Sequence, residues 1–219
     1  MHGKAKVRAV SSFKIRGPSG LLAVALAAVC VGVFATPAAN AATVGASCGY
    51  TTFSQPYMPW SDPADYVSTR NGTFETSSSG WTLKNGAKRV LGGNPYLNSG
   101  LYSIYLPVGS YALSPLTCIE TGFPFARLFA TTKMPDLYQT NTLRIDVVYK
   151  DAIYRKTVTE PAGVISQTGE WTPSPLLTLP NPENILPDKL GKLWVQYKII
   201  PLYRSAWKID DFYVDPKRR

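Results

Sequence analysis

The sequence predicts an all-β fold, an antiparallel β-sandwich of the jelly-roll kind with about ten short strands. The 219-residue chain carries 17 Gly and 18 Pro residues spread along its length. Short runs rich in Val, Ile, Leu, Tyr, Phe and Thr lie between these breaks, and no 3.6-residue periodicity follows the first 41 residues. Short strands between Gly, Pro and Asn turns favour a sandwich over a barrel enzyme.

The two clearest strands, over 143–150 and 193–200, alternate apolar and polar residues, as a strand with one buried face does. Their apolar positions are Leu143, Ile145, Val147 and Tyr149 in the first, and Leu193, Val195, Tyr197 and Ile199 in the second. The remaining strands are predicted, in chain order, over 73–75, 81–84, 87–91, 102–106, 111–114, 125–131, 154–159, 176–179 and 207–214. Loops are predicted at 94–95 and 173–175, where Pro and polar residues gather.

The first 41 residues have the parts of a secretory signal peptide in the right order. A basic start precedes a 14-residue apolar run over 21–34, and Ala39-Asn40-Ala41 supplies a small-x-small cleavage site. Two alternatives are less favoured. An uncleaved anchor needs roughly 18–20 apolar residues, and a lipoprotein needs a small residue where Val29 precedes Cys30. Since no twin arginine is present, general secretion is expected.

Cleavage after residue 41 leaves a single jelly-roll domain over 42–219, with its core over about 48–216, and no transmembrane segment. We expect this domain to be secreted, either extracellular or associated with the cell surface. The nominal net charge of +9 falls to +4, because removing five of the 23 Lys and Arg residues leaves 18 against 14 Asp and Glu. The cations are dispersed and the terminal cluster over 217–219 has only three, so nucleic-acid binding is not expected.

Catalysis is not expected either. Cleavage removes the only histidine, His2, which excludes Ser-His-Asp and Cys-His chemistry and imidazole metal sites. Glycosidases need two carboxylates across a cleft, yet no Glu-x-Asp-x-Glu string occurs and the glutamates are isolated. We therefore expect a binding protein and not an enzyme.

Two cysteines, Cys48 and Cys118, remain after cleavage. An even pair in an exported domain predicts one disulfide, which would close a loop of about 70 residues. The alternative is two reactive thiols, and it is less favoured because neither cysteine has a histidine or a second thiol nearby in sequence.

Segments at the two ends of the domain resemble the galactose-binding-like jelly-roll domains, which include several carbohydrate-binding modules. The opening segment is Asn71-Gly72-Thr73-Phe74-Glu75 followed by Gly80-Trp81-Thr82-Leu83, and the closing segment is the run 207–214. The stretches 59–62 and 171–174 are similar to a group of uncharacterised secreted bacterial proteins with this fold. The resemblance covers nearly all of 48–216 and implies that the first and last strands lie close together.

The resemblance also implies one structural calcium ion between those strands. Calcium prefers hard oxygen ligands, and Glu75 with Asp210 or Asp211 would supply carboxylates. Asp210 is the better candidate if Phe212 and Val214 face the core, because alternation puts it on their side. The alternative is that Glu75 hydrogen-bonds a turn and the Asp pair is a solvated strand end.

The function that the resemblance favours is recognition of a carbohydrate or a cell-envelope glycan. Sugars offer C–H faces for aromatic stacking and rims of hydroxyls. The candidate ligand residues are the polar and aromatic side chains opposite the core on the two clearest strands, together with Arg127 if its strand pairs alongside: Arg127, Arg144, Asp146, Trp194 and Gln196. The alternative is a structural or protein-interaction sandwich of the cell envelope, in which Trp194 packs under a loop and the charges form an ordinary solvated face.

Overall fold

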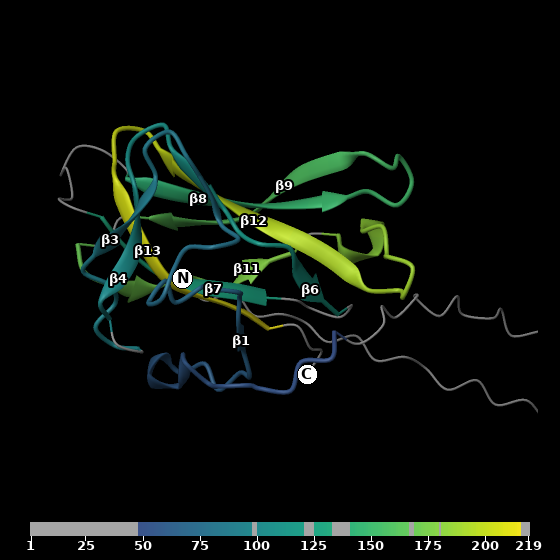
Figure 1. Ribbon diagram of the computed structural model, residues 1–219, viewed down its shortest axis with the longest axis horizontal. Helices are drawn as coiled ribbons and strands as arrows, with labels where there is room; N and C mark the ends of the chain where they lie inside the picture. Colours follow the sequence, from purple (N-terminus) through teal and green to yellow (C-terminus); the bar gives the residue numbers. More distant parts are fainter. Residues whose placement is uncertain are drawn as a thin grey trace, which may run out of the picture. The chain divides into compact units, whose positions relative to one another are not determined.

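Two antiparallel sheets pack face to face as a β-sandwich in the computed structural model (Figure 1). The structure describes residues 48–97, 100–120, 125–132, 141–166, 169–179 and 181–215. The expected signal peptide and the basic cluster at 217–219 lie outside these residues. Within the described part, no helix combines the length and the apolar character that crossing a membrane requires.

The first sheet has seven strands. In spatial order they are β10 (Thr172–Pro173), β7 (Phe125–Thr132), β13 (Trp207–Asp215), β4 (Tyr102–Leu106) and β3 (Lys88–Leu91), with β1 (Val67–Ser68) paired to β13 and β11 (Leu177–Thr178) paired to β7. The second sheet has six strands. In order they are β2 (Thr82–Lys84), β5 (Tyr111–Leu113), β12 (Leu193–Leu202), β8 (Thr142–Lys150) and β9 (Thr157–Ser166), with β6 (Thr117–Ile119) paired to β12. Two 3₁₀ turns, η1 (Met58–Trp60) and η2 (Pro182–Asn184), complete the elements.

The all-β sandwich is confirmed, while several strands differ from the prediction. The segment 73–75 is not a strand, because Phe74 has φ of 55°, in the left-handed region that extended backbone never enters. The strand predicted over 154–159 begins later and runs to Ser166, since a tight turn occupies 151–156. The short strands β1, β6 and β10 were not predicted. Strand β10 contains Pro173, which is tolerated because β10 is an edge strand.

The register between β8 and β12 arranges the main core. These strands pair antiparallel over eight positions, from Val195 opposite Tyr149 to Leu202 opposite Thr142. All the apolar positions predicted for these two strands are buried, with Ile145, Val147 and Tyr197 fully so. Because side chains alternate across a strand, the intervening residues must lie on the other face of the sheet.

The opening segment closes the sandwich against the last strand, as the resemblance implies. The Phe212 N–H donates to the Gly72 carbonyl at 3.0 Å, and the Thr69 N–H donates to the Phe212 carbonyl at 3.1 Å. A Cβ on Gly72 would lie 2.5 Å from that Phe212 oxygen, so only glycine allows this approach. The Trp81 ring packs edge-on against Phe212 with centroids 5.7 Å apart.

The N-terminal described segment covers the seven-stranded sheet on the face turned away from the main core. A second buried cluster there joins residues of this segment to β7 and β13: Tyr57, Ala64, Tyr66, Phe129 and Tyr213. The Tyr57 hydroxyl also donates to the Asp211 carbonyl at 3.1 Å. The segment begins at the Cys48–Cys118 disulfide, which the structure contains, with Cα atoms 5.7 Å apart. This bond ties the segment to β6 of the other sheet.

Replacing both cysteines in a Cys48→Ser/Cys118→Ser variant should lower the free energy of unfolding. The bond spans 70 residues, for which loop-closure entropy corresponds to roughly 4 kcal/mol. Denaturant titration of the two proteins measures the difference. An unchanged free energy of unfolding, or mass spectrometry showing two free thiols in the oxidised parent, would contradict this prediction.

Candidate functional site

The residues of β8 and β12 that alternate with the core share the outward face of the six-stranded sheet. Lys198 lies opposite Asp146 and Gln196 opposite Val148 in the register of the two strands. Together these strands place eight side chains on this face: Arg144, Asp146, Val148, Lys150, Trp194, Gln196, Lys198 and Ile200. Four of the five predicted ligand residues are therefore brought to one surface.

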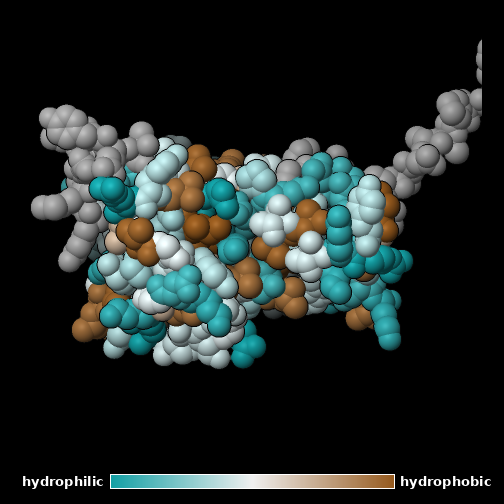
Figure 2. Space-filling view, turned by 90° about the horizontal axis from the view of Figure 1, so that it is seen from above, coloured by the Kyte–Doolittle hydropathy of each residue, from teal (hydrophilic) through white to brown (hydrophobic). Residues whose placement is uncertain are grey.

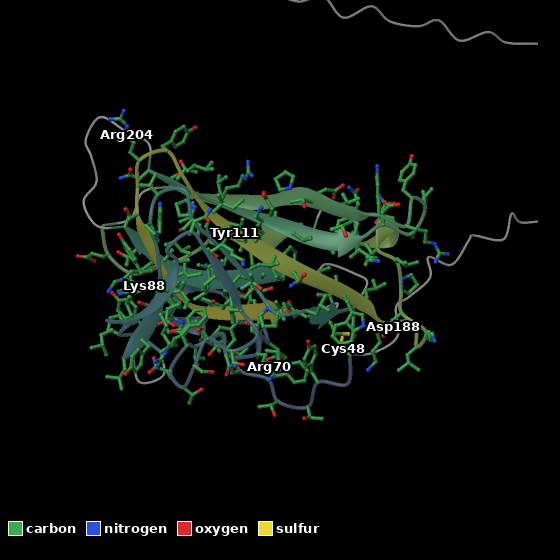
Figure 3. The ribbon with its side chains drawn as sticks, turned by 45° about the horizontal axis from the view of Figure 1, so that its top comes forward. Cys48, Arg70, Lys88, Tyr111, Asp188 and Arg204 are labelled. Atoms are coloured by element: carbon green, nitrogen blue, oxygen red, sulfur yellow. A yellow bond between two sulfur atoms is a disulfide. The ribbon has the colours of Figure 1, made fainter. Side chains whose placement is uncertain are left out.

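A groove lies on this face around Trp194, which is 36% exposed. On one side of the indole is a hollow of about 430 Å³, lined by β8, β9, β12, the loop before β12 and the loop between β5 and β6: Leu116, Val148, Tyr149, Lys150, Thr157, Leu186, Pro187, Asp188, Trp194 and Gln196. A second hollow of about 350 Å³, on the side of the disulfide, shares Leu116 and Trp194 with the first. We call the two hollows together the Trp194 groove. Asp188 and Cys48 lie at the same end of the sandwich (Figure 3).

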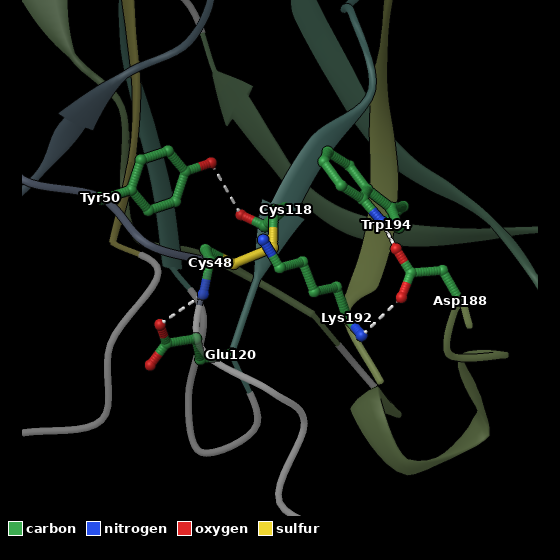
Figure 4. The surroundings of a disulfide bond; sticks show 7 residues. All are labelled: Cys48, Tyr50, Cys118, Glu120, Asp188, Lys192 and Trp194. Atoms are coloured by element: carbon green, nitrogen blue, oxygen red, sulfur yellow. Dashed lines mark hydrogen bonds between the residues drawn. A yellow bond between two sulfur atoms is a disulfide. The ribbon is translucent and has the colours of Figure 1, made fainter. Parts of the chain in front are cut away.

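Asp188 holds the indole of Trp194 in a fixed orientation. The indole N–H donates to the Asp188 carboxylate at 2.8 Å, and the Lys192 backbone N–H donates to its other oxygen at 2.9 Å (Figure 4). The Leu190 backbone N–H donates to that same oxygen at 2.8 Å. The indole donor, followed by these backbone donors, lowers the pKa of Asp188 below its usual value. The carboxylate is thus charged at neutral pH, and the exposed ring is oriented before any ligand arrives.

Polar groups border the groove beside the ring. The Gln196 amide N–H donates to the Ser114 carbonyl at 2.7 Å, and Lys150 and Thr157 also line the groove. Val148 and Lys150 lie on the same face as Asp146. Alternation along the sequence places Lys150 on this face with Arg144 and Asp146, and it would place the apolar Val148 there as well. Asp188 and Leu116 lie in loops, and no pattern in the sequence marks them.

Arg144 and Asp146 lie on the same face but do not line the groove. Their side chains form an ion pair at 3.1 Å, in which Arg144 is half-exposed and Asp146 is buried. Further along, the Lys198 ammonium lies 4.6 Å from the ring centre of Tyr111. This part of the face is charged and occupied by its own contacts.

Arg127 does not join this face. Its strand β7 belongs to the seven-stranded sheet, where it pairs with β13, β10 and β11. The Arg127 guanidinium forms an ion pair with Asp62 at 2.8 Å, donates to the Ser174 carbonyl, and lies 4.6 Å from the Tyr57 ring centre. It holds the N-terminal segment in place.

The carboxylates expected to bind calcium lie near the closing strand. Asp210 and Asp211 are both buried, so the alternative of a solvated strand end does not describe them. Asp210 accepts the backbone N–H groups of Asn94 and Asp211, each at 2.8 Å, and the Asn94 side chain donates to Asp211 at 2.9 Å. Glu75 accepts the Leu101 N–H at 3.1 Å. These acids therefore hold the loop that connects β3 to β4 through hydrogen bonds to Asn94 and Leu101.

The residue types fit calcium, since carboxylates and carbonyls are its usual ligands. Among the described residues, however, no three His, Cys, Asp or Glu side chains are grouped so that they could hold a metal ion. Burial first, and then the neighbouring Asp211 carboxylate, raise the pKa of Asp210 to about 8. The structural calcium ion stays a prediction, and the titration of Asp210 offers a way to test it.

Comparisons with known proteins find this fold in carbohydrate-binding modules. The CBM22-1–GH10 modules of Clostridium thermocellum endo-1,4-beta-D-xylanase 10B, solved with xylohexaose, match at a TM-score of 0.52 and 17% identity over 70% of this chain and 29% of that chain. The CBM22-1 xylan-binding domain of Paenibacillus barcinonensis Xyn10C has a TM-score of 0.47 and 12% identity over 71% and 97%. No family model and no curated protein matches the sequence. The chain thus has the jelly-roll fold of carbohydrate-binding modules, while its ligand is not defined by the likeness.

The raised pKa of Asp210 predicts a specific pH dependence of stability. In the unfolded chain this carboxyl loses its proton near its ordinary pKa of 3.8, whereas the folded protein keeps it up to about pH 8. Stability should therefore fall as pH rises between these values, by at most about 1.4 kcal/mol per pH unit, and level off above. Denaturant unfolding from pH 5 to 8 in the presence of a chelator measures the slope.

An Asp210→Asn variant should lose this slope, and an equal slope in both proteins would contradict the assignment. A calcium ion that bound the Asp210 carboxylate would displace its proton, raise the melting temperature and flatten the slope in the parent. Repeating the series with excess calcium therefore tests the calcium expectation separately.

Proposed function

We propose that the protein is a non-catalytic carbohydrate-binding module that binds a glycan in the Trp194 groove. The observation that carries this proposal is the partly exposed indole of Trp194, fixed by Asp188 on the outward face of a jelly-roll sheet. A ring held in advance loses little conformational freedom when a ligand stacks on it.

The groove has the chemistry that a sugar ring needs. Trp194, Leu116 and Val148 offer apolar surface for the C–H faces of the ring. Lys150, Thr157 and Gln196 lie beside that surface and can bond hydroxyl groups. Because the two hollows meet at Trp194, a chain of sugars is favoured over a single one.

Binding is favoured over catalysis by the state of the acid in the groove. Of the described residues that line it, Asp188 is the sole carboxylate. Glycosidases of the two-carboxylate type need an acid that can give up a proton. Asp188 instead accepts three N–H groups and has a lowered pKa.

We place this activity outside the cell, with a cell-envelope glycan as the partner. Support comes from the signal-peptide pattern over residues 1–41 and from the disulfide, since disulfides persist in oxidising compartments. The xylohexaose bound to the Clostridium thermocellum protein makes that oligosaccharide a suitable first probe.

Replacing Trp194 by Ala should weaken glycan binding by roughly 1–3 kcal/mol, the scale of losing a central aromatic contact. The change should also lower the free energy of unfolding, because the side chain is only 36% exposed and bonds Asp188, so binding is compared under conditions in which the variant stays folded. Isothermal titration with xylohexaose, followed by a glycan array to find better ligands, measures the binding.

A matched control is Tyr203→Asn, which removes an exposed aromatic ring elsewhere and suits the positive φ of that position. It should bind like the parent. Equal binding by the Trp194→Ala variant would place the site elsewhere. A parent that binds no glycan on the array would overturn the proposal in favour of a structural or protein-interaction module.

A further inference from the structure

Two neighbouring loops at one end of the sandwich expose large apolar side chains. The turn between β8 and β9 presents Ile153 at 73% and Tyr154 at 70% exposure, and the loop before β12 presents Leu190 at 72%. On the side of the molecule drawn in Figure 2, apolar and hydrophilic side chains are interspersed. The three most exposed large apolar side chains among the described residues therefore lie in these two loops.

The turn at 151–156 is built to hold its tip outward. Asp151 is buried, and one of its carboxylate oxygens accepts the N–H groups of Ile153 and Tyr154 at 2.9 and 2.6 Å. Its backbone N–H donates to the Lys156 carbonyl at 2.9 Å, and Arg155 adopts φ of 56° to close the turn. The apolar pair is thus fixed at the apex.

The loop at 188–192 is built in the same way around Asp188. The carboxylate of Asp188 accepts the N–H groups of Leu190 and Lys192, and its backbone N–H donates to the Lys192 carbonyl at 2.8 Å. Gly191 supplies the positive φ of 77° that the turn requires. Leu190 therefore projects from a defined tip.

The two loops are joined into one surface. The Leu186 N–H donates to the Lys150 carbonyl at 2.7 Å, and the Ala152 N–H donates to the Asn184 carbonyl at 2.8 Å. An isolated bridge also pairs Asp151 with Ile185. Both tips therefore belong to the same end of the sandwich.

Cations flank each apolar tip. Arg155 and Lys156 follow the first tip, and Lys189 and Lys192 surround the second. The acids within these two loops are Asp151 and Asp188, whose carboxylates accept N–H groups of their own loops. Glu183 is a further exposed acid on η2, where the neighbouring Asn184 carbonyl accepts the Ala152 N–H. Four cations therefore stand against three acids, and the end of the sandwich presents its apolar side chains with a small excess of positive charge.

We propose that this end of the sandwich, which we call the two-loop tip, binds the surface of a bilayer that contains anionic phospholipid. Ile153, Tyr154 and Leu190 enter the headgroup region, and the neighbouring cations contact lipid phosphates. Aliphatic and Tyr side chains at protruding positions, next to Lys and Arg, suit the bilayer interface. This inference is independent of glycan binding in the Trp194 groove.

A bilayer fits these loops better than a glycan does. The tips project, whereas a carbohydrate site is a concave surface that surrounds its ligand. Of the three tip side chains, Tyr154 alone offers a flat ring for a sugar to stack on, whereas Ile153 and Leu190 offer only aliphatic groups. The cations alone would fit any polyanion, so the apolar tips are the feature that distinguishes a lipid surface.

The test is sedimentation of the protein with vesicles of phosphatidylglycerol and phosphatidylcholine, compared with vesicles of phosphatidylcholine alone. We expect binding to the anionic vesicles only, weakened by salt. An Ile153→Ser/Tyr154→Ser/Leu190→Ser variant should bind at least about tenfold more weakly, since apolar insertion is lost. An Arg155→Gln/Lys156→Gln/Lys189→Gln variant should bind about 100-fold more weakly, or roughly fivefold per charge.

Control variants distinguish vesicle binding by the two-loop tip from effects of the groove and from nonspecific adsorption. Leu91→Ser removes an apolar side chain of similar exposure on β3 and should bind vesicles like the parent. Gln196→Ala changes the groove at a side chain that bonds the Ser114 carbonyl and neither loop, and it should also bind vesicles like the parent. All variants should keep the parent's unfolding transition. Equal binding by the apolar-tip variant, no binding of the parent to anionic vesicles, or binding only to a soluble polyanion such as heparin would overturn the proposal.

Discussion

The antiparallel register between β8 and β12 is the constraint on which both the core and the proposed glycan site depend. Eight residue pairs fix it, and a slip by one residue would turn every side chain of a strand to the opposite face. If β8 slipped, Ile145 and Val147 would meet water while Arg144 entered the core. If β12 slipped, Tyr197 would meet water while Lys198 entered the core. The cost of burying those charges makes the observed register the stable one, and that same choice places Trp194 on the surface.

Contacts between residues far apart in sequence hold the opening segment, the N-terminal segment and the loop between β3 and β4 around this pair of strands. The close approach of Gly72 to the Phe212 carbonyl joins the opening segment to the last strand. The disulfide and the ion pair between Arg127 and Asp62 hold the N-terminal segment against the two sheets. Buried acids on β13 bond the loop that connects β3 to β4. Each tie links residues far apart in sequence, so the loops around the groove rest on a rigid frame.

Local patterns explain what could be predicted from the sequence. Alternation over 143–150 and 193–200 is a property of each strand alone, and it suffices to place Asp146, Trp194 and Gln196 on one face. An even number of cysteines suffices for the disulfide. The sheet to which β7 belongs depends on pairing between distant strands, and the condition for including Arg127, that its strand pairs alongside, is not met. The support of Trp194 by Asp188 depends on loop geometry, and Phe74 adopts a left-handed conformation that no propensity indicates.

The central claim is that a glycan lies against Trp194, and the indole N–H signals of the five tryptophans test it most directly. In a nitrogen–proton NMR titration with a glycan that the protein binds, the Trp194 signal should shift, because its ring and its bond to Asp188 border the groove. The signals of Trp81 and Trp207, buried and bonded to the Arg70 carbonyl and the Ser205 hydroxyl, should stay in place. An unmoved Trp194 signal at saturation, with a shift at Trp171 on the other sheet, would contradict the claim.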